Sequence, residues 1–237
     1  MKAVLVAGAA GGIGEGIVRA LLASGEAKVF ATSRSTERLD ELRLRLPPEL
    51  RPLFTPIVGE AGGFEGAAKV AESVAALGGA DAAVAILGRG WWTNGPTLEL
   101  APDEWKAILD EMLTGHFAFA RAIVPLLASR AGSVYLSLGG GAAFEPAPGA
   151  GLVSIAAAAQ VMLTRTLARE RGPGAPRILE LVINGSVNTR ESQHFAEPKW
   201  ITGDDVGRVV TELLLHGSTT WDAARVNGPL IVMNERR

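Results

Sequence analysis

Residues 2–14 read KAVLVAGAAGGIG, an apolar run that passes directly into a glycine-rich turn. The apolar residues do not alternate with polar ones, which is typical of a strand buried on both faces of a parallel sheet. Gly8 allows a tight turn out of the strand, Gly12 lets the backbone approach a pyrophosphate, and Gly14 lets the next helix pack close to the sheet. That helix begins near Ile13, and its N-terminus offers free N–H groups to a phosphate. The stretch predicts a dinucleotide loop, with a glycine-rich turn that binds nothing as the alternative.

The rest of the chain alternates short apolar runs with longer helical patterns. Strands are expected at residues 2–7, 28–32, 52–58, 82–87, 133–138, 178–183 and 229–233. Helices are expected near residues 13–24, 36–45, 64–77, 103–128, 151–171 and 203–215. This alternation predicts an α/β fold, a Rossmann-like doubly wound parallel sheet of seven strands in the order 3-2-1-4-5-6-7 with helices on both faces. No linker interrupts it, so residues 1–237 are expected to form a single domain. The weakly periodic stretch 186–202 is a candidate for a mobile flap.

The composition excludes several classes of protein. The chain has no cysteine, which rules out disulfides, zinc–thiolate sites, iron–sulfur clusters and a cysteine nucleophile. Lys and Arg number 23 against 25 Asp and Glu, and the net charge of −2 indicates no nucleic-acid or anionic-membrane surface. No signal peptide or membrane span is expected, because the first apolar run is too short. We therefore expect a soluble, cytoplasmic protein.

Several motifs resemble those of the short-chain dehydrogenase/reductase family. Residues 7–14 resemble its T-G-x-x-x-G-I-G, with Ala7 in place of Thr. Residues 112–117 resemble its N-L-T-G-x-F, and residues 163–170 resemble the end of its active-site helix. Residues 184–189 resemble its P-G-x-V-x-T, and residues 226–232 resemble its last strand. The resemblance covers nearly the whole chain. It implies the fold above and cofactor-binding residues at Gly8, Gly12, Ile13, Gly14 and Thr189.

The end of the second strand indicates which dinucleotide would bind. An NAD site places Asp or Glu here to bind the ribose 2′-hydroxyl, whereas this chain has Ser33 and Arg34. Arg34, with Ser33 or Ser35, can clamp a 2′-phosphate, which resembles the NADP-dependent members of the family. The sequence thus favours NADP(H) over NAD(H). The alternative is an arginine on a helix-entry loop with no ligand.

The four residues that carry the family's chemistry are missing at their expected positions. The Tyr position falls on Val153, the Lys position on Ala157, the Asn position on Met112, and the Ser position on Gly139 or Gly140. These side chains cannot transfer a proton. The catalytic residues are therefore unknown, and the sequence predicts a degenerate member of the family.

Other residues near the expected cleft are possible replacements. His116, Ser137 and Glu145 are the candidates, each with a bland alternative as a packed histidine, a strand end and a solvated loop charge. The pair Trp91-Trp92 is expected to wall an apolar pocket or an interface, or to form a partly exposed lid.

Three functions remain open from the sequence. The first is a non-catalytic protein that binds a nucleotide or acts in assembly. The second is an NADP-dependent oxidoreductase, or another enzyme, that uses non-standard cleft residues. The third is a structural subunit paired with an active relative. The resemblance also implies a homodimer or homotetramer joined through helices 103–128 and 151–171, where the run of alanines at 156–159 would permit close approach.

Overall fold

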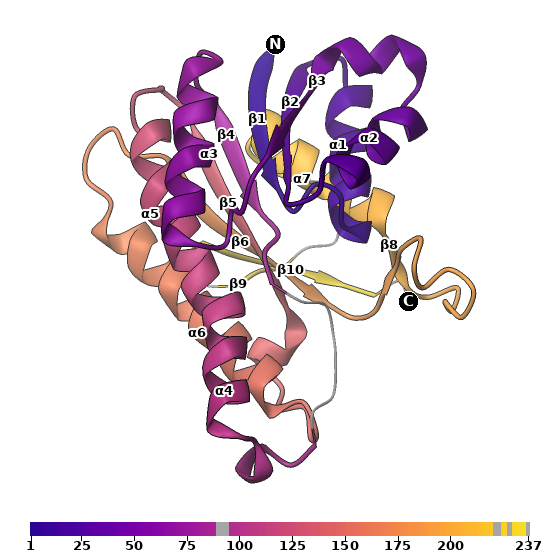
Figure 1. Ribbon diagram of the computed structural model, residues 1–237, viewed down its shortest axis with the longest axis vertical. Helices are drawn as coiled ribbons and strands as arrows, with labels where there is room; N and C mark the ends of the chain where they lie inside the picture. The colour runs from indigo at the N-terminus through magenta and orange to yellow at the C-terminus, as the bar shows by residue number, and fades with distance from the viewer. Residues whose placement is uncertain (89–94, 220–223, 227–228, 236–237) are drawn as a thin grey trace.

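The computed structural model describes residues 1–88, 95–219, 224–226 and 229–235, so Trp91-Trp92 lie outside the described residues. One sheet forms the centre of the molecule (Figure 1), in the order β3-β2-β1-β4-β5-β6-β10-β9. Its seven parallel strands are β1 (Lys2–Ala7), β2 (Ala27–Ser33), β3 (Phe54–Val58), β4 (Ala82–Ala85), β5 (Val134–Gly140), β6 (Arg177–Asn184) and β10 (Leu230–Asn234). The predicted strand order is confirmed. The sequence did not reveal β9 (Ala224–Val226), which adds to the edge in the antiparallel direction.

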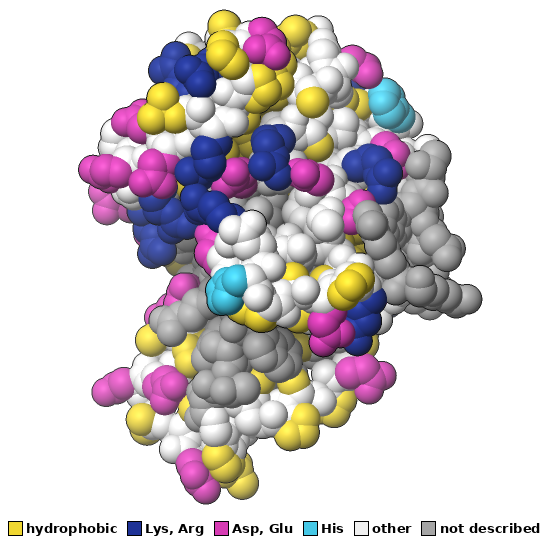
Figure 2. All heavy atoms as spheres, turned by 90° about the vertical axis from the view of Figure 1, so that its right-hand side faces the viewer, with side chains coloured by type: hydrophobic (Ala, Val, Ile, Leu, Met, Phe, Trp, Pro, Cys, Tyr) yellow, Lys and Arg dark blue, Asp and Glu magenta, His cyan; other side chains and the backbone are white. Residues whose placement is uncertain are grey.

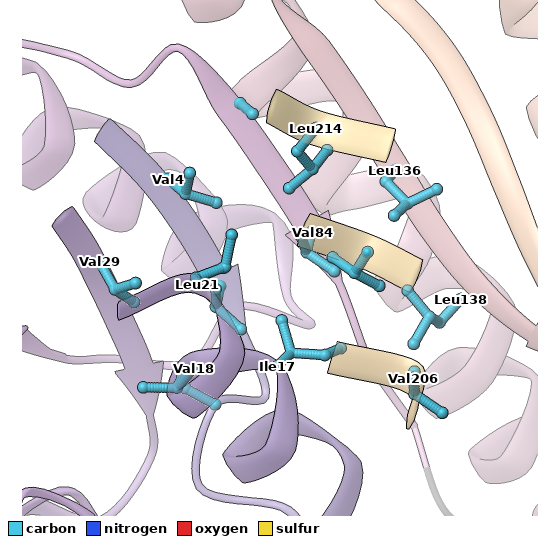
Figure 3. Packing of buried hydrophobic residues seen from close by; sticks show 14 of the residues in the cluster. Val4, Ile17, Val18, Leu21, Val29, Val84, Leu136, Leu138, Val206 and Leu214 are labelled. Atoms are coloured by element: carbon cyan, nitrogen blue, oxygen red, sulfur yellow. The ribbon is translucent and has the colours of Figure 1, made fainter. Parts of the chain in front are cut away.

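Helices cover both faces of the sheet. They are α1 (Gly12–Ala23), α2 (Thr36–Arg45), α3 (Phe64–Ala76), α4 (Pro102–Leu109), α5 (Gly115–Leu127), α6 (Gly151–Glu170) and α7 (Gly203–Leu215), with 3₁₀ turns at 48–53, 97–99 and 141–143. On one face, Val4 and Val84 of the sheet pack with Ile17 of α1 and Val206 of α7 (Figure 3). On the other, Leu5 packs with residues of α3 and α5. Alternate residues of β1 therefore enter opposite cores, which is why this strand is apolar throughout.

The contact between α1 and α7 depends on glycine. A Cβ at Gly16 would overlap the carbonyl of Gly203, and a Cβ at Gly207 would overlap the carbonyl of Gly16. The two helices can approach this closely only because these side chains are absent. The N-terminus of α7 is capped by Thr202, whose hydroxyl accepts from the Asp205 amide at 3.0 Å. This packing fixes α1, and with it the glycine loop, against the C-terminal part of the chain.

Two predicted elements differ from the observed ones. The helix expected at 103–128 is divided by a π-helical turn at Asp110–Thr114, because one turn holds an extra residue that a 3.6-residue period does not reveal. The stretch 186–202 contains two short paired strands, β7 (Val187–Asn188) and β8 (Ile201–Thr202). Among the described helices, α6 has the length and apolar composition of a membrane span, yet it packs on β5 and β6 as a core helix.

Candidate dinucleotide site and the buried network beside it

The glycine loop has a backbone that only glycine adopts easily. Gly8 has a φ of +79°, and a Cβ there would overlap the Ile86 carbonyl of the neighbouring strand end. A Cβ at Gly14 would overlap the Gly8 carbonyl. The first turn of α1 therefore lies directly on the loop, so its free N–H groups point into the space at the carboxyl end of β1.

Thr189 lies against this loop, although it is far away in sequence. A Cβ at Gly12 would be 2.5 Å from the Thr189 Cβ and 2.6 Å from the Glu191 carboxylate. The sequence interpretation left the space over Gly12 to a pyrophosphate, whereas the structure places these two side chains there. Burial works against the charge of Glu191, but hydrogen bonds from its own amide, Thr189 and Arg190 lower its pKa. The Glu191 side chain is about half exposed and pairs with Arg190 at 3.2 Å. A pyrophosphate at Gly12 would require this carboxylate to move aside.

The end of β2 brings two cations towards the loop. Arg34 is exposed and forms an ion pair with Glu60 at 3.6 Å. Arg38, one helical turn later, donates to the Ala10 carbonyl at 2.9 Å. The Ser35 hydroxyl caps α2, so of the two serines Ser33 keeps the freer hydroxyl. Arg38 was missed in the sequence, although its i+4 spacing from Arg34 is the signal that would have found it. In Figure 2, which faces this side, basic and acidic side chains are interspersed.

A buried polar network lies between the sheet and the helices α5 and α6. His116 Nδ1 is 3.3 Å from the Ser137 hydroxyl, and its Nε2 is 3.2 Å from the Leu87 carbonyl. Gln160 donates to Ser137 at 2.9 Å and to the Glu180 carboxylate at 3.1 Å. All four side chains are buried. The network therefore links the chain just after β4 with the middle of β5 and of β6 through hydrogen bonds beneath the surface.

Burial shifts the pKa values of this network in opposite directions. It lowers the pKa of His116 to about 4, so this histidine is neutral at pH 7. It raises the pKa of Glu180 to about 7, against smaller lowering effects of Thr164 and Gln160. The Oε2 atom of Glu180 has no hydrogen-bond partner within the part of the chain that the structure describes. A neutral histidine and a carboxyl close to its titration point thus lie in one hydrogen-bonded chain.

Of the three candidate replacements, His116 and Glu145 lie as their bland alternatives predicted, a packed histidine and an exposed loop charge. His116 does not look into a cleft, because it is 2% exposed and faces Leu87 and Ser137. Ser137 is equally buried under Gln160. Glu145 is an exposed loop residue, and among the described residues its carboxylate has no hydrogen-bond or ion-pair partner. The structure unites His116 and Ser137 but leaves Glu145 apart. The sequence analysis did not identify Gln160 and Glu180 as site residues. A polar residue in an apolar helix or strand gives no local sign of its hydrogen-bond partner.

Comparison with known proteins supplies the family. The model of short chain dehydrogenases matches residues 2–198. The chain belongs to the short-chain dehydrogenase family. It is 32% identical over 177 residues to cis-2,3-dihydrobiphenyl-2,3-diol dehydrogenase of Metapseudomonas furukawaii, which covers 73% of this chain and 61% of the relative. It is 29% identical over 179 residues to dehydrogenase/reductase SDR family member 4 of Homo sapiens, covering 75% and 63%. The matched region thus spans about three fifths of these relatives.

Solved structures of short-chain dehydrogenases show the same fold. One is an NADPH-bound short-chain oxidoreductase from Pseudomonas aeruginosa PAO1, described as containing an atypical catalytic center. It has a TM-score of 0.81 and 23% identity, and the match covers 98% of this chain and 95% of the other. The family binds NAD(P), and relatives of this fold are oxidoreductases.

The positions that the sequence assigns to the family's serine, tyrosine and lysine lie at the end of β5 and on the first turns of α6. The position assigned to its asparagine, Met112, lies in the π-helical turn at Asp110–Thr114. Val153 and Ala157 are one turn apart on α6 and are 7% and 5% exposed. Gly139 lies against Glu180, because a Cβ there would be 2.5 Å from the Glu180 carboxylate. Gly140, the next residue, has open space where its Cβ would be. Gly140 is therefore the position of the two that leaves room for a serine.

Proposed function

We propose that this chain binds NADP(H) at the glycine loop and acts through binding or assembly, without the tyrosine and lysine proton transfer of its family. The observation that supports this most strongly is the buried placement of Val153 and Ala157 at the positions of that tyrosine and lysine. Neither side chain can donate or accept a proton. When bound, the cofactor supplies hydride transfer. The residues that would hold it are Gly8, Gly12, Ile13, Gly14, Ser33, Arg34 and Thr189, together with Arg38.

No other tyrosine or lysine in the described residues takes over this role. Tyr135, the one tyrosine of the chain, is 2% exposed, and burial raises its pKa. It packs beside Phe119 with ring centroids 6.2 Å apart, within the core. Lys199 is exposed and pairs with Glu197 at 3.4 Å. A carbonyl reduced by hydride would therefore lack the family's proton donor.

The preference for NADP(H) rests on charge at the end of β2. Arg34 and Arg38 both lie near the loop, and no Asp or Glu stands at the end of β2 where an NAD site would place a carboxylate for the ribose 2′-hydroxyl. Glu60 is the competing anion, since it pairs with Arg34. A 2′-phosphate would replace this exposed ion pair, which is worth little in water.

A titration with NADPH and NADH, followed by calorimetry, tests the proposal. We expect NADPH to bind more tightly than NADH. Tighter binding of NADH would contradict the NADP(H) preference, and binding of neither would leave assembly as the function. The variant that tests the charge argument is Arg34→Ala. Its matched control is Arg43→Ala, which removes the same charge from the far end of α2, away from the loop.

A second function is supported by Glu180. A buried carboxyl with a pKa of about 7 is the kind of group that serves as a general acid in enzymes. It lies beside Gly139, directly next to the position of the family's serine. An oxidoreductase that uses a non-standard donor therefore remains the alternative. Reduction of ketones or aldehydes by NADPH, lost in Glu180→Gln, would favour it over the non-catalytic function.

Assembly is proposed through the helices α4, α5 and α6. Phe117, Ile155 and Met162 on these helices are exposed apolar side chains. Within the alanine run, Ala156 and Ala157 are buried in the chain's own domain, whereas Ala158 is exposed and Ala159 is half-buried. A close approach of a second helix would therefore be made at Ala158 and Ala159. Sedimentation that shows only a 24.7 kDa species at micromolar concentration would reject a homodimer or homotetramer. Pairing with an active relative is the remaining possibility for a structural subunit.

A further inference from the structure

Four arginines line a hollow of about 620 Å³ at the junction of α6 and β6. Arg165 and Arg169 lie one turn apart on α6, Arg171 follows the end of that helix, and Arg177 is the first residue of β6. The apolar lining comes from Ala168, Ile178, Leu179 and Pro229. The hollow has the size of pockets that hold small organic ligands.

Within the part of the chain that the structure describes, no acidic side chain balances the positive charge of this hollow. Arg165, Arg169 and Arg171 form no ion pair or hydrogen bond with any side chain that the structure describes. No acidic residue lines the hollow in the described part of the chain, and the neighbouring Glu170 makes no ion pair there. Arg177 is held in place by its bond to the Gly217 carbonyl at 3.1 Å. Four guanidinium groups around one hollow repel one another, and an anion bound among them would relieve that repulsion.

A second hollow lined by arginines also contains an acidic residue. It has a volume of about 360 Å³ and is lined by Arg43, Arg51, Leu44 and Asp40. There the carboxylate of Asp40 is part of the lining, and Arg51 donates to the carbonyls of Leu46 and Leu44 at 3.0 and 2.9 Å. The α6–β6 hollow has more arginines and no such compensation.

The α6–β6 hollow is separate from the dinucleotide loop. The loop follows the carboxyl end of β1, whereas Arg177 is the first residue of β6. Because the two strands run in the same direction, Arg177 lies on the side of the sheet where the strands begin, away from the loop. Figure 1 shows the connection from α6 to β6 at the left of the molecule and α1 on the right. An anion bound there would not occupy the cofactor site.

We infer that the α6–β6 hollow is a binding site for a small polyanion carrying two or more phosphoryl or carboxylate groups. The planar fork of each guanidinium matches either group with paired hydrogen bonds, and Arg165 and Arg177 are only partly exposed, which strengthens such bonds. The apolar wall of Ile178 and Pro229 would contact the carbon skeleton of an organic polyanion. Nothing in this inference depends on the proposed NADP(H) binding.

The test is calorimetric titration with inorganic pyrophosphate and, in a second arm, citrate, at constant ionic strength. We expect both or one of them to bind the unmodified protein, and the double variant Arg165→Gln with Arg169→Gln to weaken that binding at least about tenfold. The arm that binds more tightly identifies the class of ligand. The matched control, Arg43→Gln with Arg51→Gln, removes the same charge and should change the affinity less than about twofold.

Three results would overturn the inference. They are the absence of millimolar binding in the unmodified protein, equal weakening in both double variants, and a loss of binding in Arg34→Ala with Arg38→Ala instead, which would place the anion at the dinucleotide loop. Arginines near a helix C-terminus also stabilise the helix, so thermal melting is measured alongside. If the Arg165/Arg169 double variant does not fold, the exposed Arg171→Gln gives the same comparison, with a smaller expected loss of about threefold.

Discussion

The glycine loop after β1 and the β5–α6 region differ in the surroundings that the structure gives to their expected site positions. In the loop, Gly8 and Gly14 still fit the tight turn and the close helix, and Arg34 and Arg38 add positive charge. In the β5–α6 region, Val153 and Ala157 join a buried surface, and a carboxyl from β6 lies beside Gly139. The comparison teaches that the dinucleotide loop and the positions assigned to proton transfer belong to separate elements, so under the proposed function one is kept while the other is lost.

The strongest test of this difference is turnover. We expect no reduction of standard ketones or aldehydes with NADPH by the family route, because the proton donor and the group that tunes it are both absent. Each such group contributes typically about a hundredfold or more, and groups that act together are lost together. NADPH oxidation followed at 340 nm measures it. A useful rate in the unmodified protein would contradict the inactive interpretation.

Restoration sharpens the same test. Val153→Tyr alone should add little, since an untuned phenol has a pKa near ~10. We expect measurable NADPH oxidation only when Val153→Tyr, Ala157→Lys and Gly140→Ser are combined. The control combination carries Gly139→Ser in place of Gly140→Ser, and should stay inactive because that serine would collide with Glu180.

The next largest effect is the pH dependence of stability caused by Glu180. Its folded pKa of about 7 lies above its ordinary value of 4.5, so its contribution to stability is present below pH 4.5 and is lost as the pH rises to about 7. Glu180→Gln should therefore be nearly neutral at pH 5 and stabilising by about 3 kcal/mol at pH 8. Urea unfolding at the two pH values measures it. Glu145→Gln, an exposed loop carboxyl, is the control and should show no such difference.

Two adjacent glycines of β5 provide a smaller comparison. Gly139→Ser should destabilise the protein by about 1–3 kcal/mol, because its Cβ would lie 2.5 Å from the Glu180 carboxylate. Gly140→Ser should change the free energy of unfolding by less than about 0.5 kcal/mol, since open space surrounds its Cβ position. Equal effects of the two substitutions in thermal or urea unfolding would show that Glu180 does not lie where the structure places it.

The smallest effect concerns the loop itself. Arg34→Ala should weaken NADPH binding about tenfold and leave NADH binding unchanged, because only the 2′-phosphate contact is removed. Glu191→Gln should strengthen both, since it removes a carboxylate beside Gly12. Calorimetric titration of the two variants with each dinucleotide measures both effects. An equal loss of both dinucleotides in Arg34→Ala would mean that Arg34 supports the loop and does not read the phosphate.

The sequence by itself determined the fold and the outline of the loop. Strands such as residues 2–7 consist mostly of consecutive apolar residues. Gly8 and Gly14 indicate a tight turn followed by a closely packed helix, and both can be recognised from the local sequence. The prediction that Val153 and Ala157 replace the family's tyrosine and lysine also comes from the sequence alone, because aligning a motif needs no tertiary structure. The π-helical turn at Asp110–Thr114 and the edge strand β9 were not, since neither has a distinct local pattern.

Only the tertiary structure decided the environment of the polar side chains. Gln160 lies on α6 and Glu180 on β6, twenty residues apart in the sequence. Their hydrogen bond of 3.1 Å depends on how α6 packs on β6. The same is true of Glu191 over Gly12 and of Arg177 beside Arg165. The burial of a residue depends on contacts between segments that are distant in the chain. Burial in turn decides the pKa of a carboxyl and whether an arginine has a counter-ion.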